Sequence, residues 1–94
     1  MIRSFKAKMT ARIADGESPK GFPADLVRSA FRKLRLLNGA EDLRDLASPP
    51  GNRLEALGGD RAGQYSIRVN DHWRIFFRWS DKGADDVEIV DYHD

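Results

Sequence analysis

The feature that most constrains the fold is an alternation of apolar and polar side chains between residues 64 and 79. In the first part of this stretch, Tyr65, Ile67 and Val69 alternate with polar residues. In the second part every other residue is again large and apolar, namely Trp73, Ile75, Phe77 and Trp79. A two-residue period is that of a β-strand with one buried face, and Asn70-Asp71 suits the turn between two strands. The pattern predicts a β-hairpin whose apolar face is covered by helices.

Shorter patterns on either side of this hairpin predict the rest of the fold. Apolar residues recur at helical spacing in residues 24–38, and Pro23 and Asn38-Gly39 suit the two ends of a helix. Further short elements are predicted as helices at residues 7–14 and 40–46, and as strands at residues 1–5, 53–57 and 87–92. This order predicts an α+β fold, in which an N-terminal strand and two to three helices pack on a mainly antiparallel sheet that ends in a four-strand meander.

Length and composition limit the number of domains and the kind of site. The 94 residues suit a single domain over residues 1–94, and so small a domain has room for a shallow surface cleft rather than an enclosed cofactor site. There is no cysteine, which excludes disulfides and thiolate metal sites. The N-terminus lacks an apolar signal core, and no segment has the ~20 apolar residues of a membrane helix. We therefore expect a cytoplasmic protein with no membrane contact.

Several common catalytic sites are excluded by the residues present. Gly58-Gly59 lacks the lysine and the helix-opening context of a phosphate-binding loop. The only histidines are His72 and His93, which are too few for a zinc site in a chain without cysteine. Ser66 and the distant His93 have no supporting signature of a serine-nucleophile site. We expect neither a metal ion nor a cofactor.

Arginine is the residue type best suited to chemistry in the half of the chain that forms the sheet. Five arginines lie there: Arg53, Arg61, Arg68, Arg74 and Arg78. Alternation places Arg68, Arg74 and Arg78 on the face opposite the apolar residues. Guanidinium groups bind phosphate through paired hydrogen bonds and stay charged at neutral pH, so these arginines are candidates for holding a scissile phosphate. The alternative is that some of them form structural ion pairs with nearby acids, which are Asp60, Asp71, Glu88 and Asp91.

The closing residues Asp91, Tyr92 and His93 follow directly after the last predicted strand. His93 titrates near neutral pH, so it could donate a proton to a leaving 5′-oxygen or accept one from a ribose 2′-hydroxyl. Tyr92 could stack on a base or hydrogen-bond a phosphate. The alternative is that His93, one residue from the end of the sequence, is a frayed surface residue without a catalytic role.

Four segments carry a resemblance to a known family. The longest is Gly59–Ile75, which reads GDRAGQYSIRVNDHWRI, and the others are Met1–Phe5, Ser48–Leu54 and Glu88–His93. In these segments the sequence resembles the HigB-like toxins of the RelE/ParE superfamily, in particular the branch that includes the GraT-type toxins. With the middle helix in the expected place, the resemblance spans nearly the whole chain, and its motifs are long and specific.

The resemblance implies a RelE-like fold and the function of a toxin in a type II toxin–antitoxin system. Such a toxin is a metal-independent endoribonuclease that cleaves mRNA in the ribosomal A site, with the 2′-hydroxyl of the RNA as nucleophile, and thereby inhibits translation and growth. The implied partners are mRNA, the ribosome with its 16S rRNA, and a HigA-type antitoxin with a helix-turn-helix domain. Contact with operator DNA would be made only through that antitoxin.

The resemblance also implies roles for individual residues. Arg74 matches the phosphate-stabilising arginine of the family, and Asp91, Tyr92 and His93 match its C-terminal active-site cluster. We expect RNA or phosphate contacts from four further residues, which are Arg53, Arg61, Arg68 and Glu55. Some members carry a histidine in place of Glu55 and a lysine in place of Gly58. Because of these departures, His93 is expected to take a larger share of the proton transfer, with Arg53 and Arg61 as compensating cations.

Two other functions are compatible with the sequence. ParE-like toxins resemble this fold and inhibit DNA gyrase by binding, without enzymatic activity, and a fold does not by itself decide a function. The third alternative is a transcriptional accessory protein that acts only within the antitoxin complex. The C-terminal cluster distinguishes the first two functions, because a toxin that only binds gyrase does not need His93.

Overall fold

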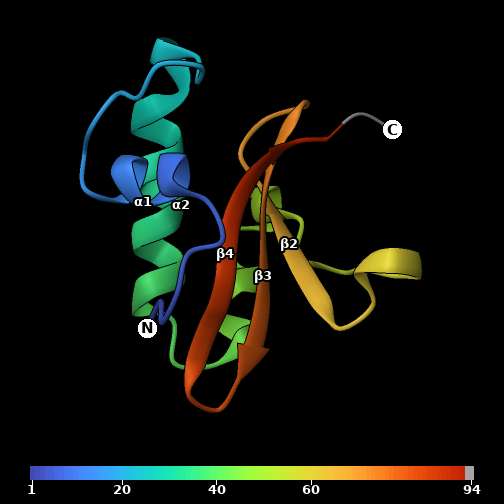
Figure 1. Cartoon of the computed structure of the whole chain (residues 1–94). Coiled ribbons are helices and arrows are strands. Elements are labelled where there is room, and N and C mark those ends of the chain that lie inside the picture. Colours follow the sequence, from blue (N-terminus) through green and yellow to red (C-terminus); the bar gives the residue numbers. More distant parts are fainter. Residues whose placement is uncertain (93–94) are drawn as a thin grey trace.

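The computed structural model describes residues 1–92 and has the predicted α+β order (Figure 1). The helices are α1 (Lys8–Ala14) and α2 (Val27–Gly39), and the strands are β1 (Glu55–Ala56), β2 (Gln64–Arg68), β3 (Trp73–Ser80) and β4 (Gly83–Asp91). Short 3-10 helices complete the chain as η1 (Ala24–Leu26), η2 (Leu43–Ala47), η3 (Pro50–Asn52) and η4 (Gly59–Arg61). Among residues 1–92, no helix is both long and apolar enough to cross a membrane.

The sheet is an antiparallel meander in the order β1-β2-β3-β4. Residues 64–68 of β2 pair with residues 74–78 of β3, which confirms the predicted hairpin. The side-chain Oδ1 of Asn70 closes the turn, because it accepts the backbone N–H groups of His72 at 2.9 Å and Trp73 at 2.8 Å. Asparagine is favoured in such turns because its side chain can satisfy backbone donors two or three residues further on.

The N-terminal segment lies beside β4 at the edge of the sheet (Figure 1). It forms two isolated parallel bridges, which pair Ile2 with Ala84 and Phe5 with Val87, instead of the continuous strand expected over residues 1–5. The segment therefore covers the exposed edge of β4, where unpaired backbone groups would otherwise invite pairing with another chain.

Helices α1 and α2 cover one face of the sheet, and the core lies between the two layers (Figure 1). From α2, the residues Ala30, Leu34 and Leu37 are buried, as expected for one face of a helix. From the sheet, the fully buried core residues are Ile67, Ile75, Phe77, Ala84 and Val87. Tyr65, Trp73 and Trp79 pack partly buried against them. The predicted inward face of the hairpin is confirmed.

The strands β1 and β4 differ in length from those expected. β4 begins at Gly83 rather than at residue 87. The sequence did not predict this start, because the acidic residues before Val87 interrupt the apolar alternation. At the same place Asp86 has a positive φ of 53° and the register with β3 is irregular. β1 has two residues rather than the five expected over 53–57. Arg53 cannot belong to it, since its backbone is left-handed, with φ 46° and ψ 58°.

The second face of the sheet is not uniformly exposed, although its alternation with apolar residues indicated a solvent face. Ser66 and Phe76 lie on this side and are fully buried. The guanidinium carbon of Arg61 lies 4.2 Å from the centre of the Phe76 ring, and the Tyr92 ring meets the same ring edge-on at 5.5 Å. Side chains of the sheet and of the η4 turn thus form a small second layer, on which the candidate site is built.

The contact between the N-terminal segment and β4 can be tested at Gly83. This residue has a φ of 129°, and a Cβ on it would lie 2.2 Å from the carbonyl oxygen of Met1. We expect Gly83→Ala to lower the free energy of unfolding by ~2–3 kcal/mol, through backbone strain and loss of this contact. Urea unfolding measures it. The control is Gly39→Ala, which meets no atom within 4 Å and should not destabilise; equal losses in both variants would contradict the close approach.

Candidate functional site

A shallow hollow of about 230 Å³ lies on the face of the sheet that is turned away from the helices. Its position follows from alternation, because Arg74 and Ser66 adjoin the core residues Ile75 and Ile67 and therefore point to the other side. The hollow, called here the arginine hollow, is lined by Arg53, Glu55, Arg68, Asn70, Asp71, Arg74 and Tyr92. Three guanidinium groups and two carboxylates in so small a space make it a polar site with a net positive charge.

Arg74 is the best-fixed cation of the arginine hollow. Its Nε donates to Ser66 Oγ at 2.9 Å, and its Nη2 donates to the carbonyl oxygen of Arg53 at 2.7 Å. The same Nη2 lies 3.8 Å from Glu55 Oε1. The side chain is only 12% exposed, against 56% for Glu55. A guanidinium has five N–H donors in a rigid plane, so two hydrogen bonds to different elements fix the plane in which the remaining donors lie.

The carbonyl that accepts the hydrogen bond from Arg74 belongs to Arg53, whose backbone is in the left-handed conformation. Arg53 follows the η3 turn and is one of two non-glycine residues among 1–92 with a positive φ. A left-handed backbone costs ~1–2 kcal/mol for an L-residue and persists only where the surrounding structure holds it. Here the Arg53 N–H donates to the carbonyl of Pro50 at 3.1 Å, which turns the chain so that the Arg53 carbonyl faces β3.

Arg68 and Asp71 form the opposite wall, at the β2–β3 turn. Arg68 Nη2 donates a hydrogen bond to Asp71 Oδ1. This hydrogen bond, followed by the charge of Arg68, lowers the pKa of the Asp71 carboxyl below its ordinary value of 3.8. Asp71 is therefore ionised at neutral pH, and it holds the Arg68 guanidinium at the rim. The ion-pair alternative from the sequence is found here. Because the Asp71 side chain is 82% exposed, the pair is weak enough for Arg68 to exchange the carboxylate for a phosphate.

Arg61 lies outside the arginine hollow, under the neighbouring part of the same face. Its Nη1 donates to Glu88 Oε1 at 3.0 Å and to Gln64 Oε1 at 3.2 Å, while its guanidinium stacks over Phe76. Its side chain is thus occupied by contacts within the protein. Of the four arginines expected to contact RNA or phosphate, the structure brings Arg53, Arg68 and Arg74 together and leaves Arg61 apart.

The closing residues reach the arginine hollow in part. Asp91 ends β4, where it pairs with Trp73 of β3. Tyr92 lines the hollow and is 40% exposed, and its backbone N–H donates to the carbonyl of His72. Tyr92 is therefore held at the rim by its backbone and by the contact of its ring with Phe76. His93, the expected proton donor, lies outside the described residues.

Sequence reasoning missed two residues of this site. From the sequence, Ser66 is considered only as a nucleophile and that role is excluded, whereas its hydroxyl serves as an acceptor for Arg74. Asn70 is predicted only as a turn residue, and it also lines the hollow. The signal that could have found Ser66 is its place on the same strand face as Arg68, next to the strand that carries Arg74. Among residues 1–92, no cluster of three or more histidine or acidic side chains could hold a metal ion.

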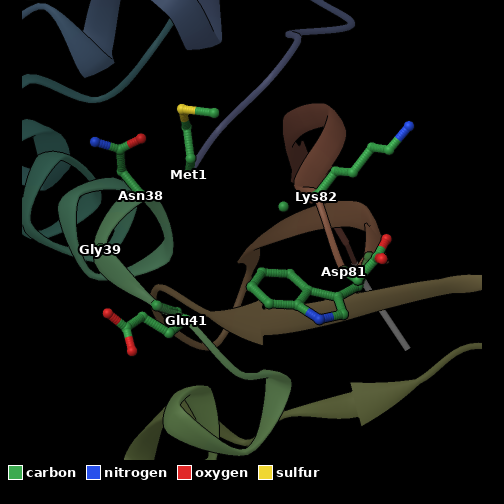
Figure 2. A pocket seen from close by; sticks show the side chains of 9 residues that line it. Met1, Asn38, Gly39, Glu41, Asp81 and Lys82 are labelled. Atoms are coloured by element: carbon green, nitrogen blue, oxygen red, sulfur yellow. The ribbon is translucent and has the colours of Figure 1, made fainter.

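A second hollow of about 320 Å³ lies at the far end of β3, near the N-terminus (Figure 2). It carries the carboxylates of Glu41 and Asp81 and the cations of Lys82 and of the Met1 amino group beside Trp79, so it has no excess of positive charge. The side chains of Glu41 and Lys82 extend in different directions (Figure 2). The arginine hollow carries an excess of cations and this hollow does not, so the arginine hollow is the better candidate for binding RNA.

The pair at the rim gives a prediction for the titration of Asp71. Since the hydrogen bond from Arg68 is the largest cause of the lowered pKa, Arg68→Leu should raise the pKa of Asp71 toward 3.8 in a ¹³C NMR titration of the side-chain carboxyl. Arg78→Leu is the control, because Arg78 pairs with Asp86 at 3.6 Å. Because the pKa of Asp71 is lower in the folded than in the unfolded protein, its ionised form stabilises the fold at pH values above the unfolded pKa. This stabilisation is lost as the pH falls through the pKa of the folded protein. An unchanged Asp71 pKa in Arg68→Leu would contradict the pair.

Comparisons with known proteins identify the family. The family described as the RelE-like toxin of the type II toxin–antitoxin system HigB matches residues 3–93. Toxin HigB-1 of Vibrio cholerae serotype O1 is 39% identical over 82 residues, which cover 86% of each chain. Endoribonuclease HigB of Proteus vulgaris is 32% identical over 93 residues, covering 99% of this chain and 100% of the relative. The chain therefore belongs to the HigB-like family of RelE-like toxins of type II toxin–antitoxin systems.

Proposed function

We propose that this toxin is an endoribonuclease that cleaves mRNA in the A site of the ribosome, with the arginine hollow as its active site. The observation that carries the proposal is the fixed guanidinium of Arg74, held by Ser66 and by the Arg53 carbonyl in a hollow whose other cations are Arg53 and Arg68. The family assignment supports the class of activity, since a relative from Proteus vulgaris is named an endoribonuclease.

The reaction needs a preorganised cation more than a metal ion. The 2′-hydroxyl oxygen of the RNA attacks the adjacent phosphorus, a 2′,3′-cyclic phosphate forms, and the bond to the 5′-oxygen of the next nucleotide breaks. Negative charge accumulates on the equatorial phosphate oxygens in the transition state, and a fixed donor aimed at that charge lowers the barrier. Arg74 supplies this donor, with Arg53 and Arg68 holding the flanking phosphates.

Two proton transfers complete the reaction. One group must take the proton of the 2′-hydroxyl, and another must give a proton to the leaving 5′-oxygen. His93 is the proposed donor, because imidazole changes its charge near neutral pH, and Asp91 and Tyr92 would orient it or the RNA. Glu55 is the proposed acceptor, since it places a carboxylate 3.8 Å from Arg74 Nη2 in the same hollow.

The small size of the arginine hollow supports the proposal that cleavage depends on the ribosome. The hollow has a volume of about 230 Å³ and the exposed residue Tyr92 in its lining, so we expect it to contact no more than a short piece of RNA. Holding the RNA in the attacking geometry can account for ~7–11 kcal/mol of a reaction barrier. We propose that the ribosomal A site supplies this positioning, through contacts of the toxin with 16S rRNA, so that free RNA is cut poorly. A cytoplasmic location follows from this substrate.

The family also implies the partner that controls the activity. A type II toxin has a cognate antitoxin, and this chain belongs to such a family. We propose that the antitoxin is of the HigA type, with a helix-turn-helix domain, and that the toxin meets operator DNA only through it.

Arg74→Ala tests the proposed active site. Loss of one donor to the transition state should lower kcat by ~10²–10³-fold, measured by primer-extension mapping of cuts in mRNA on translating ribosomes. The matched control is Arg78→Ala, which removes the same charge from the same strand but lies outside the arginine hollow, in an exposed pair with Asp86. Growth arrest by the wild-type protein with damaged DNA and no cut transcripts would contradict the ribonuclease and favour inhibition of DNA gyrase.

His93→Ala tests the proton transfer separately. If His93 protonates the leaving 5′-oxygen, we expect the wild-type rate to fall at higher pH as the imidazole loses its proton. The His93→Ala variant should lose ~10²–10⁴-fold in kcat and should lack this fall. The pH profile of cleavage on programmed ribosomes measures both effects. A variant with the wild-type rate and pH profile would assign His93 no catalytic role.

A further inference from the structure

A buried chain of contacts leads from the Arg53 carbonyl, through Asn52, to helix α2. Asn52 is fully buried. Its Nδ2 donates to the carbonyls of Leu46 and Ser48, each at 3.2 Å, and its Oδ1 accepts a hydrogen bond from Lys33 Nζ. Both N–H groups and the oxygen of the amide are therefore used, so the orientation of this side chain is fixed.

Lys33 joins the helix layer to this loop. It lies on α2 and is half-buried, while the exposed cations of the same helix stand in solvent. Burial, followed by the charges of Arg32 and Arg68, lowers the pKa of the Lys33 amine. Lys33 is not among the residues that line the arginine hollow. Its amine serves the loop through Asn52.

The contact matters because Asn52 directly precedes the left-handed Arg53. The carbonyl of Arg53 receives Arg74 at 2.7 Å only while the chain turns at this residue. A fixed Asn52 holds the end of the η3 turn, and a fixed turn aims the carbonyl. The sequence of contacts is Lys33, Asn52, the Arg53 carbonyl and then Arg74.

We infer that Lys33 and Asn52 are positioning residues that set the orientation of the Arg74 guanidinium through the Arg53 carbonyl. The inference rests on the proposed ribonuclease function, since it assigns these residues to the same site. Neither residue touches the substrate. Their effect is on the geometry of transition-state stabilisation, where a misplacement of about 1 Å from outside the site can cost ~10²-fold in rate.

Lys33→Met tests the inference, because it keeps the length of the side chain and removes the donor. We expect kcat to fall by ~10- to 100-fold with KM nearly unchanged. The matched control is Arg28→Met, which removes an exposed charge from the same helix and should leave kcat unchanged. Equal changes in both variants that affect only KM and disappear at high salt would overturn the inference. They would show that Lys33 contributes only a general electrostatic attraction for RNA.

A double variant separates positioning from general destabilisation. In a background of Arg74→Ala, Lys33→Met should cause no further loss of kcat, because residues that act through one group are not additive. A further loss equal to that in the wild-type background would overturn the inference. If Lys33→Met does not fold, Lys33→Gln replaces it. Glutamine keeps a polar side chain at this half-buried position but is too short to keep the contact with Asn52.

The NMR signal of the Arg74 Nε–H group distinguishes failure of this inference from failure of the proposed function. The signal reports the hydrogen bond to Ser66 in the free toxin and needs no activity. We expect it to shift in Lys33→Met and to stay in place in Arg28→Met. A protein that cuts no RNA but shows this shift would contradict the proposed function and leave the coupling in place, whereas an unshifted signal in an active enzyme would contradict the coupling alone.

Discussion

The pairing register of β2 with β3 is the constraint on which the rest of the structure depends. It directs Ile67 and Ile75 into the core under α2, and Ser66 and Arg74 to the opposite side. A shift of one residue would exchange the two faces of a strand and bring the Arg74 charge into the apolar core, where an unpaired charge is very costly. The Asn70 side chain, which closes the turn between the strands, makes that shift harder still.

This register explains how so small a domain can hold a precise site. Arg74 is anchored on a central strand whose other face is packed against the helices, so the guanidinium is supported by the core itself. The second support comes from the loop before β1, through the Arg53 carbonyl. The rim is built differently, because the carboxylates of Asp71 and Glu55 are largely exposed. Rigid and adaptable parts of the site thus have separate structural origins.

The arginines of the sheet illustrate how far sequence reasoning reached. Their position opposite the apolar residues was predicted for Arg68, Arg74 and Arg78, because alternation depends only on the local period of a strand. Which of the arginines form internal ion pairs was left open, and the structure assigns this differently to each. Arg61 is held by Glu88, 27 residues away, and Arg68 by Asp71 in the adjacent turn. A local sequence pattern cannot predict the contact between Arg61 and Glu88, because η4 and β4 are brought together only by the fold.

The sequence by itself determined the hairpin and its two faces, the principal helix, and the family, since these follow from local periodicity and from long motifs such as Gly59–Ile75. Only the tertiary structure decided which arginines share one hollow, that Ser66 is an acceptor, and that Lys33 of α2 supports the loop through Asn52. The physical reason lies in the backbone of that loop. The left-handed backbone conformation of Arg53 is stabilised by the surrounding contacts and not by the preference of the residue itself. The direction of its carbonyl is therefore determined only when the layers have packed.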